Sequence, residues 1–96
     1  MSIYLTAIIK SKPGHTEQMR ASLLELVASS KTEDACLQYD LHQSEGEENL
    51  FIFHEEWASA EGLEKHNRQP HIKKFITDSK GIIDDLIIIH QTKKIA

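Results

Sequence analysis

The chain has 96 residues, which is enough for one small domain over residues 1–96 and too few for two. Its net charge is −4 with histidine neutral, and its lysines and arginines are scattered, so the sequence predicts no nucleic-acid-binding surface. The longest apolar stretch, residues 86–89, is too short to span a bilayer, no signal-peptide pattern is evident, and there is a single cysteine, so we expect a cytoplasmic protein.

The first part of the chain predicts a strand, a turn and a helix. Residues 3–10, IYLTAIIK, are apolar and β-branched without a helix or strand breaker, which is typical of a strand. A Lys-Pro-Gly turn follows at residues 12–14. Within residues 15–30 the apolar side chains recur with the spacing of one helical stripe, and they are Met19, Leu23, Leu26 and Val27.

The second part predicts a hairpin, two helices and a last strand. Residues 36–44 and 50–57 alternate in polarity on either side of a polar, glycine-containing loop, which indicates a β-hairpin. Ser59 can cap a short helix that ends near Asn67, and Pro70 suits the first turn of a further helix. The other expected features are an inward stripe of Ile72, Phe75, Ile76 and Ser79, a helix end at Gly81 and a final strand over residues 85–92.

The resulting order is β-α-β-β-α-β, with the second helix broken at residues 69–70. Short connections and the handedness of crossovers predict an α+β domain of the ferredoxin-like split βαβ type. In this arrangement the helices cover one face of a four-stranded antiparallel sheet.

Strand alternation predicts which side chains face the helices. In the hairpin these are expected to be Leu37, Tyr39, Leu41, Phe51, Phe53, Glu55 and Trp57. The outer strands are apolar on both sides, however, and a sheet that is apolar on both faces is usually covered on both. Because the chain has helices for only one face, we expect a second copy to cover the other, as a homodimer.

At this point the sequence resembles a known family. ACLQYDLHQS, a short loop, LFIFHEEWASAEGLEKHNRQPH and IKKF are similar to the antibiotic biosynthesis monooxygenase domain family, which includes quinol monooxygenases. The likeness covers essentially the whole chain. It implies a dimeric α+β barrel and a cofactor-independent monooxygenase that acts on a quinol or hydroxylated aromatic.

The motif residues of that family correspond to Tyr39, Glu55, Trp57, His66 and His71. Two positions depart from the pattern. Ala35 stands where glycine is usual, and His54 stands where tyrosine is common, which bears on the type of substrate. With Phe53, Leu63 and Phe75, the aromatic residues Tyr39 and Trp57 are expected to line the substrate pocket.

Each candidate site residue also has a plain structural interpretation. His66 is either a pocket base or a helix-end histidine that hydrogen-bonds a strand, and His71 is either a base or a polar link across the helix break. Glu55 faces the core, so we expect it to be buried and paired with His66, His71 or Arg68.

A metal site is not expected, because His66 and His71 are five residues apart with Pro70 between them. They would not share a helix face as the two histidines of the H-E-x-x-H motif do. Two alternative functions stay open: an isomerase of a small oxygenated metabolite, and a non-catalytic small-molecule-binding or stress protein. The sequence does not identify the substrate, nor whether O₂ is used.

Overall fold

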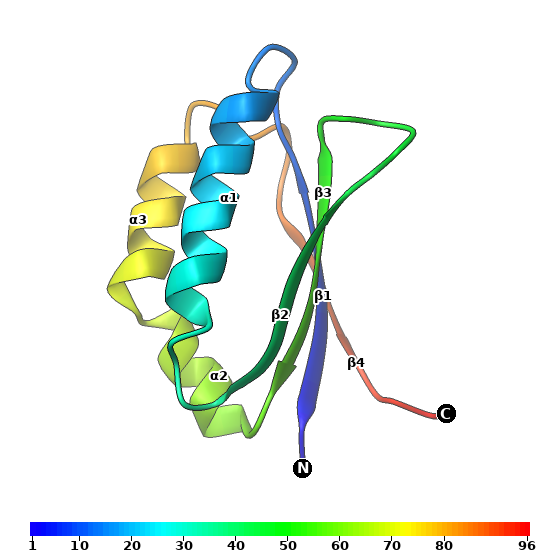
Figure 1. The fold of residues 1–96 in the computed structure, drawn as a ribbon, viewed down its shortest axis with the longest axis vertical. Coiled ribbons are helices and arrows are strands. Elements are labelled where there is room, and N and C mark those ends of the chain that lie inside the picture. The colour runs from blue at the N-terminus through cyan, green and yellow to red at the C-terminus, as the bar shows by residue number, and fades with distance from the viewer.

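The computed structural model describes all 96 residues. One layer of helices covers one face of an antiparallel sheet (Figure 1). This is the predicted ferredoxin-like fold, and the strand order is β2-β3-β1-β4. Its elements are β1 (Ile3–Lys10), α1 (Thr16–Ser30), β2 (Cys36–Gln43), β3 (Leu50–Trp57), α2 (Ala60–Asn67), α3 (Pro70–Ser79) and β4 (Ile88–Thr92). No helix is long and apolar enough to cross a membrane.

The core lies between the helices and the covered face of the sheet. Phe51, Phe53 and Trp57 alternate along β3 and are almost completely buried. Met19 and Leu23 of α1 pack with them in the same apolar cluster, as the helical stripe predicted. Burial of such side chains contributes about 1.5–3 kcal/mol each, so this layer carries much of the stability of the fold.

The other face of the sheet has no covering element (Figure 1). Ile8 of β1 pairs with Ile52 of β3 and with Ile88 of β4, which forms an apolar row across three strands. Ile8 and Ile52 are half-buried and Ile88 is exposed. The two-sided apolar pattern of the sequence is therefore present in the structure.

Local signals place the helix ends near the site. Ser59 Oγ accepts a hydrogen bond from the Gly62 amide at 3.0 Å, which satisfies one free donor of the first turn of α2. Pro70 begins α3, where its missing N–H costs nothing. Gln69 between the two helices has an extended backbone, so the predicted break separates two distinct helices.

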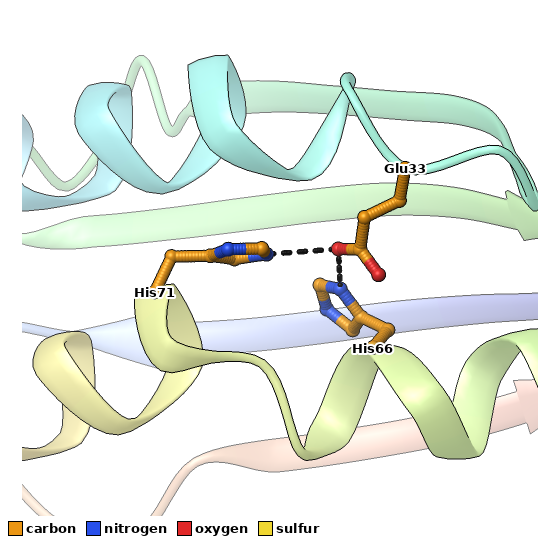
Figure 2. Close-up of side chains that lie close together, drawn as sticks. All are labelled: Glu33, His66 and His71. Carbon is orange, nitrogen blue, oxygen red and sulfur yellow. Dashed lines mark hydrogen bonds and ion pairs between the residues drawn. The ribbon is translucent and has the colours of Figure 1, made fainter.

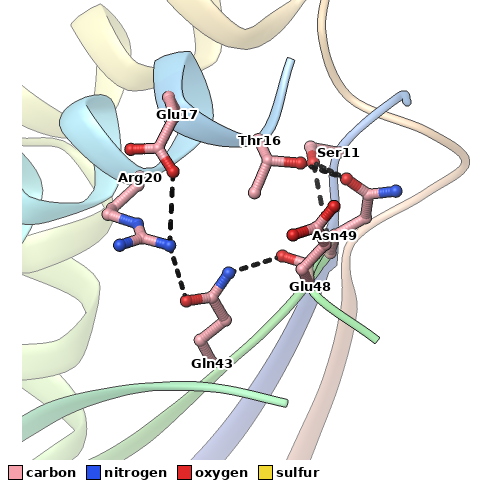
Figure 3. Close-up of polar contacts among 7 residues, drawn as sticks. All are labelled: Ser11, Thr16, Glu17, Arg20, Gln43, Glu48 and Asn49. Carbon is pink, nitrogen blue, oxygen red and sulfur yellow. Dashed lines mark hydrogen bonds and ion pairs between the residues drawn. The ribbon is translucent and has the colours of Figure 1, made fainter. Parts of the chain in front are cut away.

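A polar network at the N-terminal end of α1 connects this helix to the hairpin (Figure 3). Arg20 Nη2 donates to Gln43 Oε1 at 2.7 Å, and Gln43 Nε2 donates to the Glu48 carbonyl at 2.7 Å. Ser11 and Thr16 both donate hydroxyl protons to Asn49 Oδ1. These bonds join side chains of four segments, so they fix the hairpin loop against the start of α1.

Three local predictions were wrong. Leu37 is 56% exposed, because a β-bulge between Cys36 and Gln38 shifts the alternation of β2 by one residue. Ile76 is 51% exposed although it was assigned to the inward stripe of α3. The last strand begins at Ile88 and not at residue 85, because Asp85 has a left-handed backbone with φ of 70° that a strand cannot contain.

Candidate functional site

An apolar cavity of about 360 Å³ lies between the covered face of the sheet and the helices. Of its 14 lining residues 11 are hydrophobic, so a bound ligand would contact mainly apolar side chains. Its polar groups come from Tyr39, Glu55, His66 and Asn67. The cavity therefore combines apolar walls with a few polar groups, some of which can exchange protons.

His66 is the histidine of this cavity. It is 3% exposed, and its ring packs on Trp57 with the ring centroids 4.2 Å apart. Its Nδ1 lies 2.6 Å from Glu33 Oε2. Burial lowers the pKa of His66 below its ordinary value, while the neighbouring Glu33 carboxylate opposes this effect. Burial therefore favours the neutral ring, which is the form that can accept a proton.

His71 reaches the same carboxylate from the next helix (Figure 2). Its Nε2 lies 2.8 Å from Glu33 Oε2, so one oxygen of Glu33 joins both histidine rings. The two histidines do not share a helix, as expected. They converge nevertheless, because α2 ends at Asn67, α3 begins at Pro70 and the chain turns between them.

Glu33 is the site residue that sequence reasoning missed. It lies in the connection between α1 and β2, where residues 31–35 show neither helical nor strand periodicity. Its side chain is only 11% exposed. Its one distinguishing feature is that the connection from α1 back to the sheet passes beside the α2–α3 break. That proximity can be recognised only from the tertiary fold.

The Glu33, His66 and His71 side chains also form a set able to hold a metal ion. Two imidazole nitrogens and one carboxylate oxygen lie within 4.8 Å of one another. The two histidines lie on different helices, as the spacing argument expected, but the turn between these helices still brings them together. The contacts of 2.6 and 2.8 Å to a single oxygen are the lengths of charge-assisted hydrogen bonds, which account for the arrangement without an ion.

Glu55 is buried, as predicted, but its partner differs from the expected ones. It is 7% exposed, and its Oε1 accepts a hydrogen bond from Trp57 Nε1 at 2.9 Å. It makes no ion pair with His66, His71 or Arg68. The Arg68 side chain leaves the end of α2 toward solvent and pairs with exposed Glu64. Burial raises the pKa of Glu55, and the bond from Trp57 lowers it in part.

The structure separates the predicted site residues into two groups. Those that line the cavity are Tyr39, Phe53, Glu55, His66 and Phe75. Trp57, Leu63 and His71 lie outside its lining, Trp57 as a fully buried support that contacts His66 and bonds Glu55. His54 is not in the cavity lining either. It lies opposite Thr6 of β1 in the strand register, and the alternation of β3 directs its side chain to the open face of the sheet.

The comparisons with known proteins agree with this fold. The family model for antibiotic biosynthesis monooxygenases matches residues 2–78. The chain belongs to the antibiotic biosynthesis monooxygenase family.

Individual members match along nearly the whole chain. YcnE of Bacillus subtilis (strain 168), which is named as a candidate monooxygenase, is 32% identical over 91 residues, or 95% of this chain and 96% of YcnE. The crystal structure of PA3566 from Pseudomonas aeruginosa is 35% identical, with a TM-score of 0.94 over 99% of this chain and 95% of that one. A crystal structure of an antibiotic biosynthesis monooxygenase has the same fold at 21% identity, with a TM-score of 0.92 over 98% and 99% of the two chains.

A polar groove lies on the other side of Glu33 from the cavity of this family member. Its volume is about 570 Å³, and His71 is among its lining residues. Its acidic and basic side chains are those of Glu25, Glu33, Asp34, Lys65 and Lys74. His66 thus belongs to the apolar cavity, His71 belongs to the polar groove, and Glu33 contacts both rings.

A close contact between helix and loop holds Glu33 near His66. Gly62 of α2 lies so near Ala35 that a Cβ added at Gly62 would collide with the methyl group of Ala35. The Ala58 amide also donates to the Ala35 carbonyl at 2.8 Å. Position 35, where the sequence departs from the usual glycine, therefore packs directly against the helix that carries His66.

Proposed function

We propose that the chain is a cofactor-independent monooxygenase acting on a quinol or another hydroxylated aromatic molecule in the apolar cavity. The observation that carries the proposal is the buried His66 at the wall of a cavity lined by Tyr39, Phe53 and Phe75. Membership of the antibiotic biosynthesis monooxygenase family supports the reaction class. A planar aromatic ring would find stacking partners in these walls.

The proposed reaction begins with proton transfer to His66 from a phenolic hydroxyl of the substrate. The resulting anion transfers one electron to O₂, and the radical pair recombines to form a C–O bond to a peroxide, which takes back the proton held by His66. When the carbon that bears this hydroperoxide also carries a hydrogen, loss of that hydrogen as a proton and cleavage of the O–O bond release water. One oxygen atom then remains in the product as a carbonyl, and the other is in the water. The apolar lining keeps bulk water from the radical pair, and the walls hold it in place for recombination.

We also propose that two copies associate through the open face of the sheet, in the cytoplasm. The support is the apolar row of Ile8, Ile52 and Ile88, which no element of the chain covers. A stable interface of this kind buries about 1,200–2,000 Å² in total. A face of four strands has room for such a contact.

Oxygen uptake with a panel of dihydroxylated aromatics tests the proposed reaction, using protein treated with a chelator. We expect uptake with at least one compound, and a rate about 10² to 10⁴ lower for His66→Ala. His15→Ala is the matched control, because that ring lies outside the cavity lining and hydrogen-bonds Gln18. Uptake lost on chelation and restored by one metal ion would contradict the proposal, as would equal rates for both variants.

A second candidate function is isomerisation by proton transfer. One specific observation favours it: His66 and Glu55 line the same cavity, and burial lowers the pKa of His66 while it raises that of Glu55. Titratable groups shifted in opposite directions are suited to act as base and acid. Substrate turnover without oxygen uptake would select this function, and binding without turnover would indicate a non-catalytic protein.

A further inference from the structure

The Glu33 carboxylate stands between two rings that belong to different surroundings (Figure 2). His66 lines the apolar cavity, and His71 lines the polar groove. Both rings contact the same oxygen, Oε2, at 2.6 and 2.8 Å. A carboxylate placed in this way can control the orientation and the charge of the ring on its cavity side.

We propose that Glu33 is a positioning residue for the base: it holds His66 in the tautomer with Nε2 unprotonated and stabilises the imidazolium that forms when this ring takes a proton. His71 fixes the carboxylate from its other side. Neither Glu33 nor His71 touches the substrate in this scheme. The kinetic part of the inference rests on the proposed function, but the tautomer does not.

The tautomer follows from what a carboxylate can do. An ionised carboxylate accepts hydrogen bonds and cannot donate them. His66 must therefore carry its proton on Nδ1, the atom 2.6 Å from Glu33, and its Nε2 keeps a free lone pair. By the same reasoning His71 carries its proton on Nε2. Nε2 is the nitrogen of His66 left for a substrate proton, because Nδ1 is engaged by Glu33.

The charge of the ring is the second effect. Burial disfavours the imidazolium form of His66, so proton uptake from a substrate would be costly without a compensating charge. Glu33 supplies that charge at hydrogen-bond distance, with a side chain only 11% exposed, so water screens the pair weakly. The other titratable groups around His66 are His71 beyond Glu33, and Glu55 and Tyr39 in the cavity wall.

His71 restricts the carboxylate that orients the base. A glutamate side chain at the end of a loop has several rotamers, and a single bond to His66 would not select one. The second donor, at 2.8 Å, holds Oε2 at the point where both bonds can form. Because His71 lies in the first turn of α3 and His66 in the last turn of α2, the pair also connects the two helices to the loop after α1.

Long-range ¹H–¹⁵N NMR of the histidine rings tests the tautomer without any substrate. We expect His66 to show a protonated Nδ1 and an unprotonated Nε2 in the wild-type protein. In Glu33→Gln the amide can donate to Nδ1, so we expect the tautomer to change or become mixed and the His66 titration to move to lower pH. His15 serves as an internal control, because its ring lies far from this carboxylate in the fold and should not change.

Kinetics test the consequence on any substrate that the oxygen-uptake panel identifies. Glu33→Gln should lower kcat by at least about tenfold, and by up to about 10⁴-fold as for an orienting carboxylate in a catalytic triad, with KM nearly unchanged. The acid limb of the kcat profile should move to lower pH with the His66 titration. Glu33→Asp, which keeps the charge, should recover part of the rate, and Glu17→Gln, on the exposed surface of α1, should have no effect.

Three outcomes would overturn the inference. The first is a wild-type His66 protonated on Nε2. The second is a folded Glu33→Gln variant with unchanged tautomer, titration and kcat. The third is stoichiometric, tight binding of Zn²⁺ that shifts both ring signals and is lost in Glu33→Gln, since the three side chains would then be metal ligands. If the panel shows no turnover, the proposed function fails, while the NMR result still decides the tautomer.

Discussion

The two faces of the sheet are built from the same strands and differ in what covers them. Along β3 the residues facing the helices, Phe51, Phe53 and Trp57, are buried almost completely. Ile52 and His54, which alternate with them, face the uncovered side and retain contact with solvent. The alternation of one strand thus separates the residues that stabilise the monomer from those available to a second copy.

Because the two faces differ in this way, substitutions on them should affect folding and association separately. The covered face contains both the core and the cavity, so substitutions there should change the stability and the site of one chain. The open face touches neither the cavity nor Glu33, so substitutions there should change assembly and leave the folded monomer intact. Variants on adjacent residues of β3 can test this separation.

The largest expected effect is on the covered face. Phe53→Ala removes a buried ring from the wall of the core and the cavity, and should lower the free energy of unfolding by about 3–5 kcal/mol. Ile52→Ala, the next residue along the strand, should cost the monomer about 1 kcal/mol or less. Denaturant unfolding at low protein concentration measures both. Equal losses would show that the two faces do not differ in this way.

The next effect concerns the open face. Ile52→Asp places a charge in the apolar row and should raise the dissociation constant of the proposed dimer at least about 100-fold, or about 2.7 kcal/mol. Leu24→Asp, on an exposed position of α1, is the matched control and should leave association unchanged. Sedimentation equilibrium measures the mass of each variant. A wild-type monomer at micromolar concentration would remove the basis for the comparison.

Glu55 offers a smaller effect within the covered face. Glu55→Ala leaves the buried Trp57 Nε1–H without its acceptor and should cost about 1–3 kcal/mol. Glu55→Gln keeps an acceptor, so at acid pH, where Glu55 is protonated, its stability should stay near that of the wild type. A clear loss in Glu55→Gln, as large as that in Glu55→Ala, would mean that Glu55 has a cationic partner.

The difference in stability between Glu55→Gln and the wild type should depend on pH. Because the folded-state pKa of Glu55 is raised above the ordinary value of 4.5, the contribution of this group is present below that value and is lost as pH rises through the folded-state pKa. The stability of Glu55→Gln relative to the wild type should therefore increase from acid pH toward neutral pH. Parallel thermal unfolding curves across this range provide the measurement.

The smallest effect is expected at Arg68. Its ion pair with Glu64 lies on the exposed surface of α2, and such pairs contribute about 0.5 kcal/mol or less. Arg68→Ala should therefore leave unfolding, association and oxygen uptake nearly unchanged. A loss of several kcal/mol would restore Arg68 as the partner of Glu55, which the sequence suggested.

The fold was largely predictable because its signals are local and periodic. The helical stripe of Met19, Leu23 and Leu26, the Ser59 cap and the Pro70 start are each decided by a few neighbouring residues. Leu37 was not, because a β-bulge is a property of strand pairing and leaves the alternation in the sequence unbroken.

The site was predictable only in its two histidines and the cavity wall. His66 and His71 were selected because they resemble positions of a family motif. Glu33 lies in a loop without periodicity, and its position beside both rings depends on where the connection between α1 and β2 meets the α2–α3 break. The partner of Glu55 was missed for a related reason. Trp57 is two residues away on the same strand face, and it was considered as a core or pocket residue and not as a hydrogen-bond donor to Glu55.

The contact between Gly62 and Ala35 has a consequence for how this sequence could have diverged. The space between the loop and α2 accommodates one methyl group, and here Ala35 supplies it. Gly62→Ala alone should be destabilising, and Ala35→Gly should relieve the collision, so the two positions form a compensating pair. If position 35 becomes glycine first, the intermediate has space for a methyl group at position 62, whereas if position 62 changes first, the intermediate contains the collision. Substitutions in the loop that carries Glu33 and in the helix that carries His66 therefore depend on one another at these two positions.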